Sequence, residues 1–212
     1  QIDIDMSKTN KEKNEQKLEK FMSENKTRKV TSRKGTITTS NHIDYDKALN
    51  KALSMLGTKN ENFGFYIIVA INTGLRIGDI LNIKKRHFEK DAYTFREQKT
   101  SKAKTVPFNK HIKDYFMQLK NTSETPFKSN KGTTYTRQQI NRKIKQAFKT
   151  KDKNYSSHSL RKSFGRKVYE DNDQSENALV ILSKIYNHSN LRVTRDYLDL
   201  TQEILDDVYM SM

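Results

Sequence analysis

Apolar residues recur at three- and four-residue intervals along most of the chain beyond residue 43, which is the spacing of one face of an α-helix. Residues 63–71 differ because nearly all of them are apolar. Their number and the Thr-Gly break that follows them favour a buried central helix over a strand. Helices are therefore predicted over residues 44–56, 63–71, 76–83, 109–120, 136–148, 175–186 and, with a serine as its N-cap, from residue 156 to Val168.

Three short segments between these helices predict the strands of a small antiparallel sheet. They cover residues 87–91, 92–98 and 104–108, with turns at Lys90–Asp91 and near residues 100–103. Only seven glycines and two prolines occur in the chain, which suits long helices joined by short turns. The predicted fold class is α+β, mostly α-helical with a small three-stranded antiparallel sheet.

The first 42 residues have a different character, since they are polar and mixed in charge. A helix is possible over residues 11–22, but its only apolar residues are Leu18, Phe21 and Met22, too few to close a core. Residues 26–34 are strongly basic, and either a phosphate-following linker or a solvated tether explains them. We expect residues 1–42 to be an extension or linker and residues 43–212 to be one globular domain.

Charge narrows the class of partner. The chain has 41 Lys and Arg against 25 Asp and Glu, a formal net charge of +16, which favours a polyanion and nucleic acid first. No apolar run approaches the roughly 18 residues of a membrane span, and no signal-peptide pattern occurs, so a cytoplasmic protein is expected. The chain has no cysteine, and its five histidines lack metal-ligand spacing, so neither a metal nor a cofactor is predicted.

Candidate chemistry is concentrated in three places. His158 and Arg161 lie one helical turn apart, His188 and Tyr197 follow, and Arg76 opens the predicted helix of residues 76–83. An arginine fork matches phosphate oxygens, a histidine moves protons near neutral pH, and a tyrosine hydroxyl can attack phosphorus. For a lone arginine near a glycine turn, such as Arg76, a surface salt bridge is the default interpretation, and an i, i+3 pair on a basic helix often arises by chance.

Two further groups of basic residues fit phosphate contacts or plain solvation. Lysines gather in or beside the predicted turn near residue 100, where an extended arm is able to reach DNA. Basic residues also cover the predicted helix over residues 136–148, which suits a groove-facing or phosphate-contacting helix. The residues are Lys99, Lys102, Lys104, Arg137, Arg142, Lys143 and Lys145.

Four motifs in this order resemble the catalytic motifs of the tyrosine recombinases, a family that includes phage and transposon integrases and Xer-type resolvases. They are Thr-Gly-Leu-Arg-Ile-Gly-Asp at residues 73–79, a lysine after a strand, His-Ser-Leu-Arg-Lys-Ser-Phe at 158–164, and His-Ser-Asn at 188–190 followed by Thr-Arg-Asp-Tyr-Leu at 194–198. The resemblance runs from about Ile43 to the C-terminus. It implies the catalytic core of that family and a site-specific recombinase or integrase of bacterial or phage origin, nucleoid-associated.

The resemblance also implies roles. Arg76 and Arg161 would hold the scissile phosphate, while Tyr197 attacks it to give a 3′-phosphotyrosyl link and a free 5′-hydroxyl. His158 and His188 would orient the phosphate and assist proton transfer. No metal or ATP is implied, because guanidinium groups supply the charge stabilisation and the ester conserves the bond energy.

Two assignments depend on less regular positions. Lys99 would be the general acid for the leaving 5′-oxygen, with Lys102 as a competitor because the length of that turn varies. Asp79 would hold Arg76 in place, although the family usually has Ser-Glu where this chain has Gly78 and Asp79. Asn187 stands where glycine is common before the second histidine, and asparagine tolerates the left-handed conformation required there.

The ends of the chain raise separate expectations. Family members normally carry a helical domain before the catalytic one, and residues 1–42 are too short and polar to be it, so a truncated or a naturally short form is expected. Residues 198–212 have no Lys or Arg and carry an apolar stripe, which docks either on their own domain or on a neighbouring protomer. The second option, which the resemblance supports, implies a homo-tetramer on double-stranded DNA.

Two other classes of function also fit parts of the sequence. A non-catalytic DNA-binding module of the same fold is the alternative if cleavage is too weak to matter. A metal-dependent nuclease is disfavoured because no acidic cluster converges in the sequence.

Overall fold

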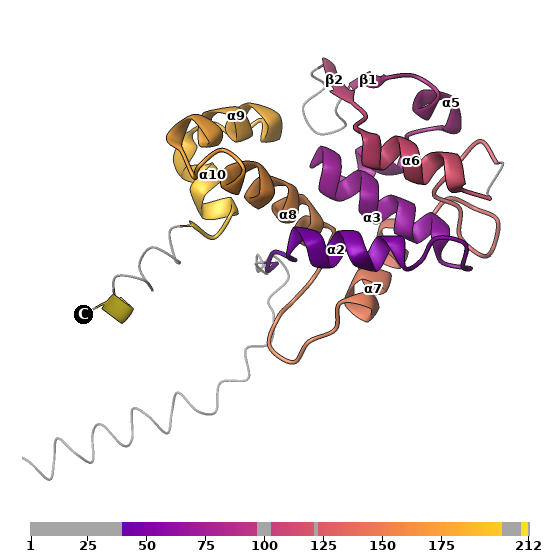
Figure 1. Cartoon of the computed structure of the whole chain (residues 1–212), viewed down its shortest axis with the longest axis horizontal. Helices are drawn as coiled ribbons and strands as arrows, with labels where there is room; N and C mark the ends of the chain where they lie inside the picture. Colours follow the sequence, from indigo (N-terminus) through magenta and orange to yellow (C-terminus); the bar gives the residue numbers. More distant parts are fainter. Residues whose placement is uncertain (1–39, 97–102, 121–122, 201–208, 212) are drawn as a thin grey trace, which may run out of the picture. The chain divides into compact units, whose positions relative to one another are not determined.

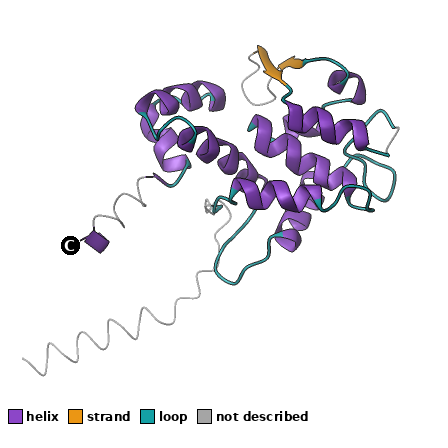
Figure 2. Cartoon of the chain, viewed as in Figure 1, coloured by secondary structure: helices purple, strands orange, loops and turns teal. Residues whose placement is uncertain are grey.

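The computed structural model describes residues 40–96, 103–120, 123–200 and 209–211, which belong to one structural unit, Thr39–Met212 (Figure 1). Most of this part of the chain is helical, and one antiparallel hairpin accompanies the helices (Figure 2). The helices are α2 (Tyr45–Leu53), α3 (Glu61–Thr73), α4 (Ile77–Leu81), α5 (Lys85–Phe88), α6 (Lys110–Gln118), α7 (Arg137–Ala147), α8 (Ser157–Glu170), α9 (Glu176–Tyr186) and α10 (Leu191–Tyr197).

Helix α3 is the buried centre of the larger hydrophobic core. Every residue from Phe63 to Ile71 is buried, and α2, α4, α6 and α8 pack against the helix. A segment that is apolar on all sides needs cover on all sides, and the surrounding helices provide it. The predicted central helix over residues 63–71 is therefore confirmed, as are the helices that correspond to α2, α4, α6, α7, α8 and α9, with ends that differ by a few residues.

Helix α3 ends at Thr73, and its C-cap residue Gly74 adopts the left-handed conformation (φ +59°). A Cβ atom at this position would run into the ring of Phe164 on α8. Glycine is thus required twice, for the backbone angle and for the close approach. The turn directs Leu75 and Arg76 back toward α8, and this return places the first candidate arginine.

The hairpin consists of β1 (Ala92–Arg96) and β2 (Ala103–Pro107), with Tyr93 opposite Val106 and Phe95 opposite Lys104. The predicted third strand over residues 87–91 was wrong, because α5 and a turn occupy this stretch. A local cap explains the outcome: His87 accepts a hydrogen bond from the Lys84 amide through Nδ1 at 2.9 Å. Phe88 alone is buried there, so no alternating face competes with the helical turn.

A second, smaller cluster joins α8, α9 and α10. Its buried members are Leu179, Leu182, Tyr186, Leu198 and Leu200, and Phe164 and Val168 of α8 pack against them. Helix α9 ends at Tyr186, and its C-cap residue Asn187 is left-handed (φ +58°, ψ +45°), so the tight turn predicted there is confirmed. Within the predicted C-terminal stripe, Leu200 is buried in its own domain, while residues 201–208 lie outside the described residues.

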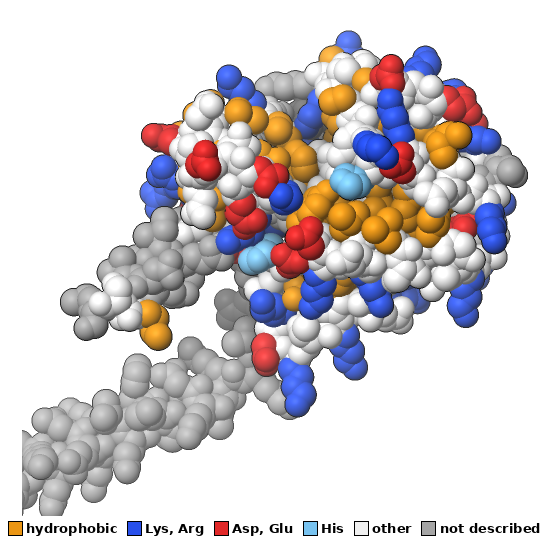
Figure 3. All heavy atoms as spheres, in the orientation of Figure 1, with side chains coloured by type: hydrophobic (Ala, Val, Ile, Leu, Met, Phe, Trp, Pro, Cys, Tyr) orange, Lys and Arg blue, Asp and Glu red, His pale blue; other side chains and the backbone are white. Residues whose placement is uncertain are grey.

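The surface of the described chain carries charges of both signs. The face in Figure 3 shows Lys and Arg side chains around its rim, acidic side chains among them, and an apolar patch near the middle. None of the helices in the described ranges has the length and apolar character that crossing a bilayer requires. The predicted helix over residues 11–22 and the basic stretch over 26–34 lie outside the described residues, so the division of the chain at residue 42 stays a prediction.

Gly64 on α3 offers a test of the central packing. A Cβ atom there would approach the Ala52 carbonyl oxygen to 2.9 Å and collide with the Tyr115 hydroxyl. Glycine to alanine in a helix interior ordinarily stabilises by about 0.5–1 kcal/mol, whereas overpacking costs about 1–3 kcal/mol. We predict that Gly64→Ala lowers the free energy of unfolding, measured by urea denaturation. Lys51→Ala, at an exposed position of α2, is the control and should leave it nearly unchanged; a stabilised Gly64→Ala protein would contradict the packing described here.

Candidate active site

The guanidinium groups of Arg76 and Arg161 converge on one main-chain atom. The carbonyl oxygen of Tyr186 accepts a hydrogen bond from Arg76 Nη2 at 3.3 Å and from Arg161 Nη2 at 3.5 Å. Tyr186 is the last residue of α9, where carbonyl groups lack helical partners and the helix dipole is negative. Two cations that repel each other are thus brought together by an acceptor suited to both.

Arg161 is held rigidly in this arrangement. The residue is 4% exposed, Nη1 donates to the Gly74 carbonyl oxygen, and the guanidinium carbon lies 4.3 Å from the centroid of the Tyr186 ring. The Tyr186 hydroxyl in turn donates to the Arg161 carbonyl oxygen at 2.6 Å. Each of the two side chains therefore hydrogen-bonds to the main chain of the other residue, and the two side chains also stack on each other.

Arg76 reaches the same carbonyl oxygen from a distant part of the sequence. It is the N-cap residue of α4, with extended backbone (φ −71°, ψ 148°), two residues after the left-handed Gly74. The sequence prediction that Arg76 begins a helix is correct. Its guanidinium meets Arg161 because Gly74 packs on Phe164, one turn along α8 from Arg161.

A pocket of about 530 Å³ opens beside the two arginines. Besides Arg76 and Arg161, its charged or titratable lining groups are His158, Arg137 and Asp79. Arg137 is the first residue of α7, and Ile77 and Gly78 at the start of α4 line the same pocket. Three arginines against one carboxylate make this pocket suited to an anion.

Tyr197 lies next to both candidate histidines. Its ring centroid is 5.3 Å from that of His188 and 6.5 Å from that of His158, and both pairs are edge-to-face. His188 follows the Asn187 turn, and its Nδ1 lies 3.0 Å from Thr194 Oγ1. His158 is exposed in the first turn of α8, where Ser156 caps the helix as predicted. The structure thus brings together five of the predicted site residues.

The Tyr197 hydroxyl is buried among these groups. It makes no hydrogen bond of normal geometry within the described residues, although the Arg161 guanidinium is near enough to act on it. Burial raises the pKa of the phenol, while Arg161 and, more weakly, Arg76 oppose the shift, and Asp199 adds to it. The net direction is upward, so the phenol keeps its proton at neutral pH.

The predicted site residues that remain are Asp79, Lys99 and Lys102. Asp79 is buried (3% exposed) in the first turn of α4, and its support of Arg76 stays a prediction. Lys99 and its competitor Lys102 lie outside the described residues, in the connection between β1 and β2.

The sequence analysis gave Tyr186 and Thr194 no role of their own in the site, and it grouped Lys104 only with the lysines near the hairpin turn. Tyr186 supplies the shared carbonyl, Thr194 is fully buried beneath His188, and Lys104 reaches from β2 to donate to the Ile185 carbonyl oxygen at 2.6 Å. Only Lys104 had a readable signal, because it alternates with buried Val106 and so points to the same side of the hairpin. The other two act through atoms or neighbours that sequence spacing does not reveal.

The pocket lined by arginines beside a buried tyrosine is a candidate anion-binding site on a mostly helical α+β domain. The model of the phage integrase family matches residues 41–203, and the chain belongs to that family. The resemblance to tyrosine recombinases stated from the motifs is thereby confirmed. A search of curated protein sequences found no match.

Solved structures share the fold at low sequence identity. XerA recombinase aligns with a TM-score of 0.60 and 18% identity, over 82% of this chain and 65% of that one. XerH site-specific recombinase bound to difH substrate aligns at 0.53 and 21%, over 76% and 50%. A lambda integrase dimer bound to a COC′ core site aligns at 0.57 and 16%, over 81% and 62%. The chain thus spans less than two thirds of the length of these relatives.

The burial of Tyr197 predicts its titration. We expect the phenol to titrate above its ordinary value of about 10. Arg161→Ala should raise the pKa further, because it removes the group that does most to lower the pKa of this phenol. NMR of protein labelled with ¹³C at tyrosine Cζ measures both values, with Tyr197→Phe assigning the resonance. A midpoint below 10 in the wild type would contradict the burial described here.

Proposed function

We propose that this domain cleaves and rejoins DNA strands as a site-specific recombinase or integrase, through a covalent 3′-phosphotyrosyl intermediate on Tyr197. The observation that carries the proposal is the convergence of Arg76 and Arg161 on one oxygen acceptor next to the Tyr197 hydroxyl. A phosphodiester oxygen is a better acceptor for guanidinium groups than a carbonyl, because it is charged. DNA would therefore engage donors that the Tyr186 carbonyl holds in place.

In the proposed reaction, the Tyr197 oxygen attacks phosphorus, the bond from phosphorus to the 5′-oxygen breaks, and the 3′-phosphate stays on the protein. Arg76 and Arg161 stabilise the negative charge that develops on the non-bridging oxygens. The phenol must lose its proton during attack, since its raised pKa keeps it neutral beforehand. His158 and His188 are the groups proposed to orient the phosphate and assist this transfer.

Several residues have supporting parts in this proposal. The contact of His188 Nδ1 with Thr194 fixes the ring, so that Nε2 is the nitrogen proposed to meet the phosphate. Lys99 is proposed to protonate the leaving 5′-oxygen, with Lys102 as its competitor, because an alkoxide leaves poorly. Asp79 is proposed to support Arg76. The chemistry needs neither metal nor ATP, since the arginines supply positive charge and the tyrosyl ester conserves the bond energy.

The partner proposed for the site is double-stranded DNA. The net charge of +16 and the basic surface of α7 support it, as do the printed descriptions of XerH and lambda integrase as DNA complexes. Assembly as a homo-tetramer on DNA, with exchange of residues 198–212 between protomers, belongs to the same proposal. So do the division at residue 42 and a cytoplasmic, nucleoid-associated location.

The covalent intermediate is directly testable. Incubation with a nicked recombination site in EDTA should give protein bound to a 3′-phosphate end, visible as a shifted band on a denaturing gel. The adduct should disappear in Tyr197→Phe, which keeps the ring and removes only the nucleophile. Retention of the adduct in that variant would remove Tyr197 from the mechanism. DNA binding without any adduct in the wild type would favour the non-catalytic DNA-binding module instead.

The arginine pocket makes a second prediction for the same assay. Arg161→Ala should slow adduct formation by at least about 10²-fold, by analogy with the loss of single transition-state donors. Arg86→Ala is the matched control, because Arg86 is an exposed arginine outside the pocket that pairs with Glu124. Equal rates for the two variants would show that Arg161 does not hold the reacting phosphate.

A further inference from the structure

We propose that Lys162 and Asp199 are positioning residues whose ion pair fixes the Tyr197 ring relative to the phosphate pocket. The proposal rests on Tyr197 being the nucleophile. Their effect is exerted through the main chain that follows Tyr197 and through the contact of Lys162 with the Tyr197 ring.

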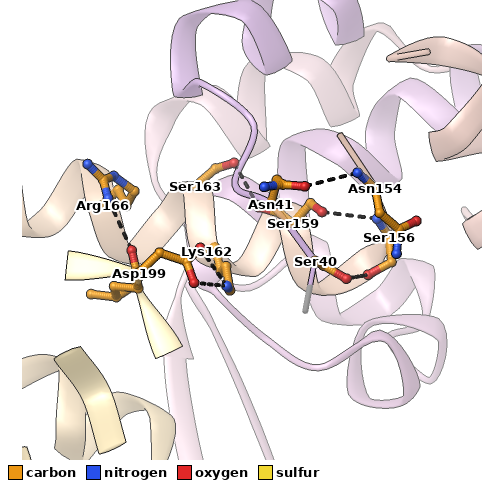
Figure 4. A network of polar contacts seen from close by, with 10 residues as sticks. Ser40, Asn41, Asn154, Ser156, Ser159, Lys162, Ser163, Arg166 and Asp199 are labelled. Atoms are coloured by element: carbon orange, nitrogen blue, oxygen red, sulfur yellow. Dashed lines mark hydrogen bonds and ion pairs between the residues drawn. The ribbon is translucent and has the colours of Figure 1, made fainter. Parts of the chain in front are cut away.

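The ion pair is buried on the lysine side. Lys162 Nζ lies 2.8 Å from Asp199 Oδ1 and 2.7 Å from Oδ2, so one ammonium group meets both carboxylate oxygens (Figure 4). The lysine side chain is 5% exposed and that of Asp199 34%. An exposed pair of this type constrains little, whereas a buried ammonium group strongly requires its partner. The contact therefore fixes where residue 199 can lie.

The backbone next to Tyr197 is held at two successive points. At residue 198, Arg166 Nη1 donates to the Leu198 carbonyl oxygen at 3.1 Å. At residue 199, whose backbone is left-handed (φ +61°), Lys162 pairs with the Asp199 side chain. Lys162 and Arg166 are one turn apart on α8, and both reach the segment after Tyr197 in Figure 4. Helix α10 has only seven residues, too few to be stable in isolation, so tertiary contacts of this kind must set its position.

The same ammonium group also faces the ring of Tyr197. Lys162 Nζ lies 5.5 Å from the ring centroid, within the range of a cation–π contact. The preceding residue, Arg161, lines the phosphate pocket. Two consecutive residues of α8 thus contact the phosphate pocket and the nucleophile. Because Arg161 and Lys162 are consecutive residues of one helix, the distance between the bound phosphate and Tyr197 is set by a single turn of α8.

An ordinary stabilising role is the competing explanation. The chain supplies a comparison, because Lys167 of α8 and Asp171, the C-cap residue of that helix, form an exposed ion pair. If charge pairing on α8 mattered only for stability, both pairs would affect cleavage through unfolding alone. If Lys162 and Asp199 position Tyr197, only their loss slows cleavage at temperatures where every variant is folded.

The test measures single-turnover adduct formation on the nicked site at saturating DNA. Lys162→Met and Asp199→Asn should each slow it at least tenfold, and the double variant should be no slower than the slower single one. Lys162→Arg should recover most of the rate, because it can pair with the same carboxylate. DNA affinity should stay within about twofold, and Lys167→Met should cleave at the wild-type rate.

A second readout does not depend on cleavage. Protein with 3-fluorotyrosine at position 197 should show a shifted or broadened ¹⁹F resonance in Asp199→Asn but not in Lys167→Met. Wild-type cleavage rates in both single variants, or losses that track the melting temperature and resist Lys162→Arg, would overturn the positioning role. Absence of the adduct from the wild type would instead defeat the proposed function itself, so the two failures are distinguishable.

Discussion

The rest of the site depends on the contact of two arginines with the carbonyl oxygen at the end of α9. Bringing two guanidinium groups together is unfavourable unless negative charge or dipole lies between them. The C-terminus of a helix provides such a dipole at no cost in side-chain ordering. Three local features make the contact possible: the left-handed turn at Gly74, the left-handed end of α9 at Asn187, and the burial of Arg161 over the Tyr186 ring.

Helix α8 connects this contact to the rest of the molecule. Leu160 belongs to the core around α3, whereas Phe164 and Val168 pack on the smaller cluster with α9 and α10. Because the helix is anchored in both clusters, the side chains along one of its faces have fixed relative positions. The side chains of His158, Arg161 and Lys162 therefore project from one rigid helix, and loops contribute mainly the turns that bring Arg76 and His188 to it.

Much of the fold follows from periodicity, but the site does not. Helical spacing and cap residues such as Ser156 and Asn187 act locally, so the sequence predicts them correctly. The prediction of a strand over residues 87–91 was wrong because the cap formed by the His87 side chain outweighed a weak alternation of apolar and polar residues. Arg76 and Arg161 were paired through family resemblance, since nothing in the local pattern states that they meet. The contacts of Lys104 and of Lys162 with distant partners depend on packing between elements, which spacing along the chain does not encode.

The acceptor shared by the two arginines belongs to the main chain, and this has an evolutionary consequence. Every amino-acid residue carries a main-chain carbonyl group, so no point mutation at position 186 can delete that oxygen. Drift at this position can alter the ring and hydroxyl that support Arg161, yet the meeting point of both arginines survives it. Natural variation should therefore be able to retune the surroundings of the pocket while its central junction is inherited unchanged.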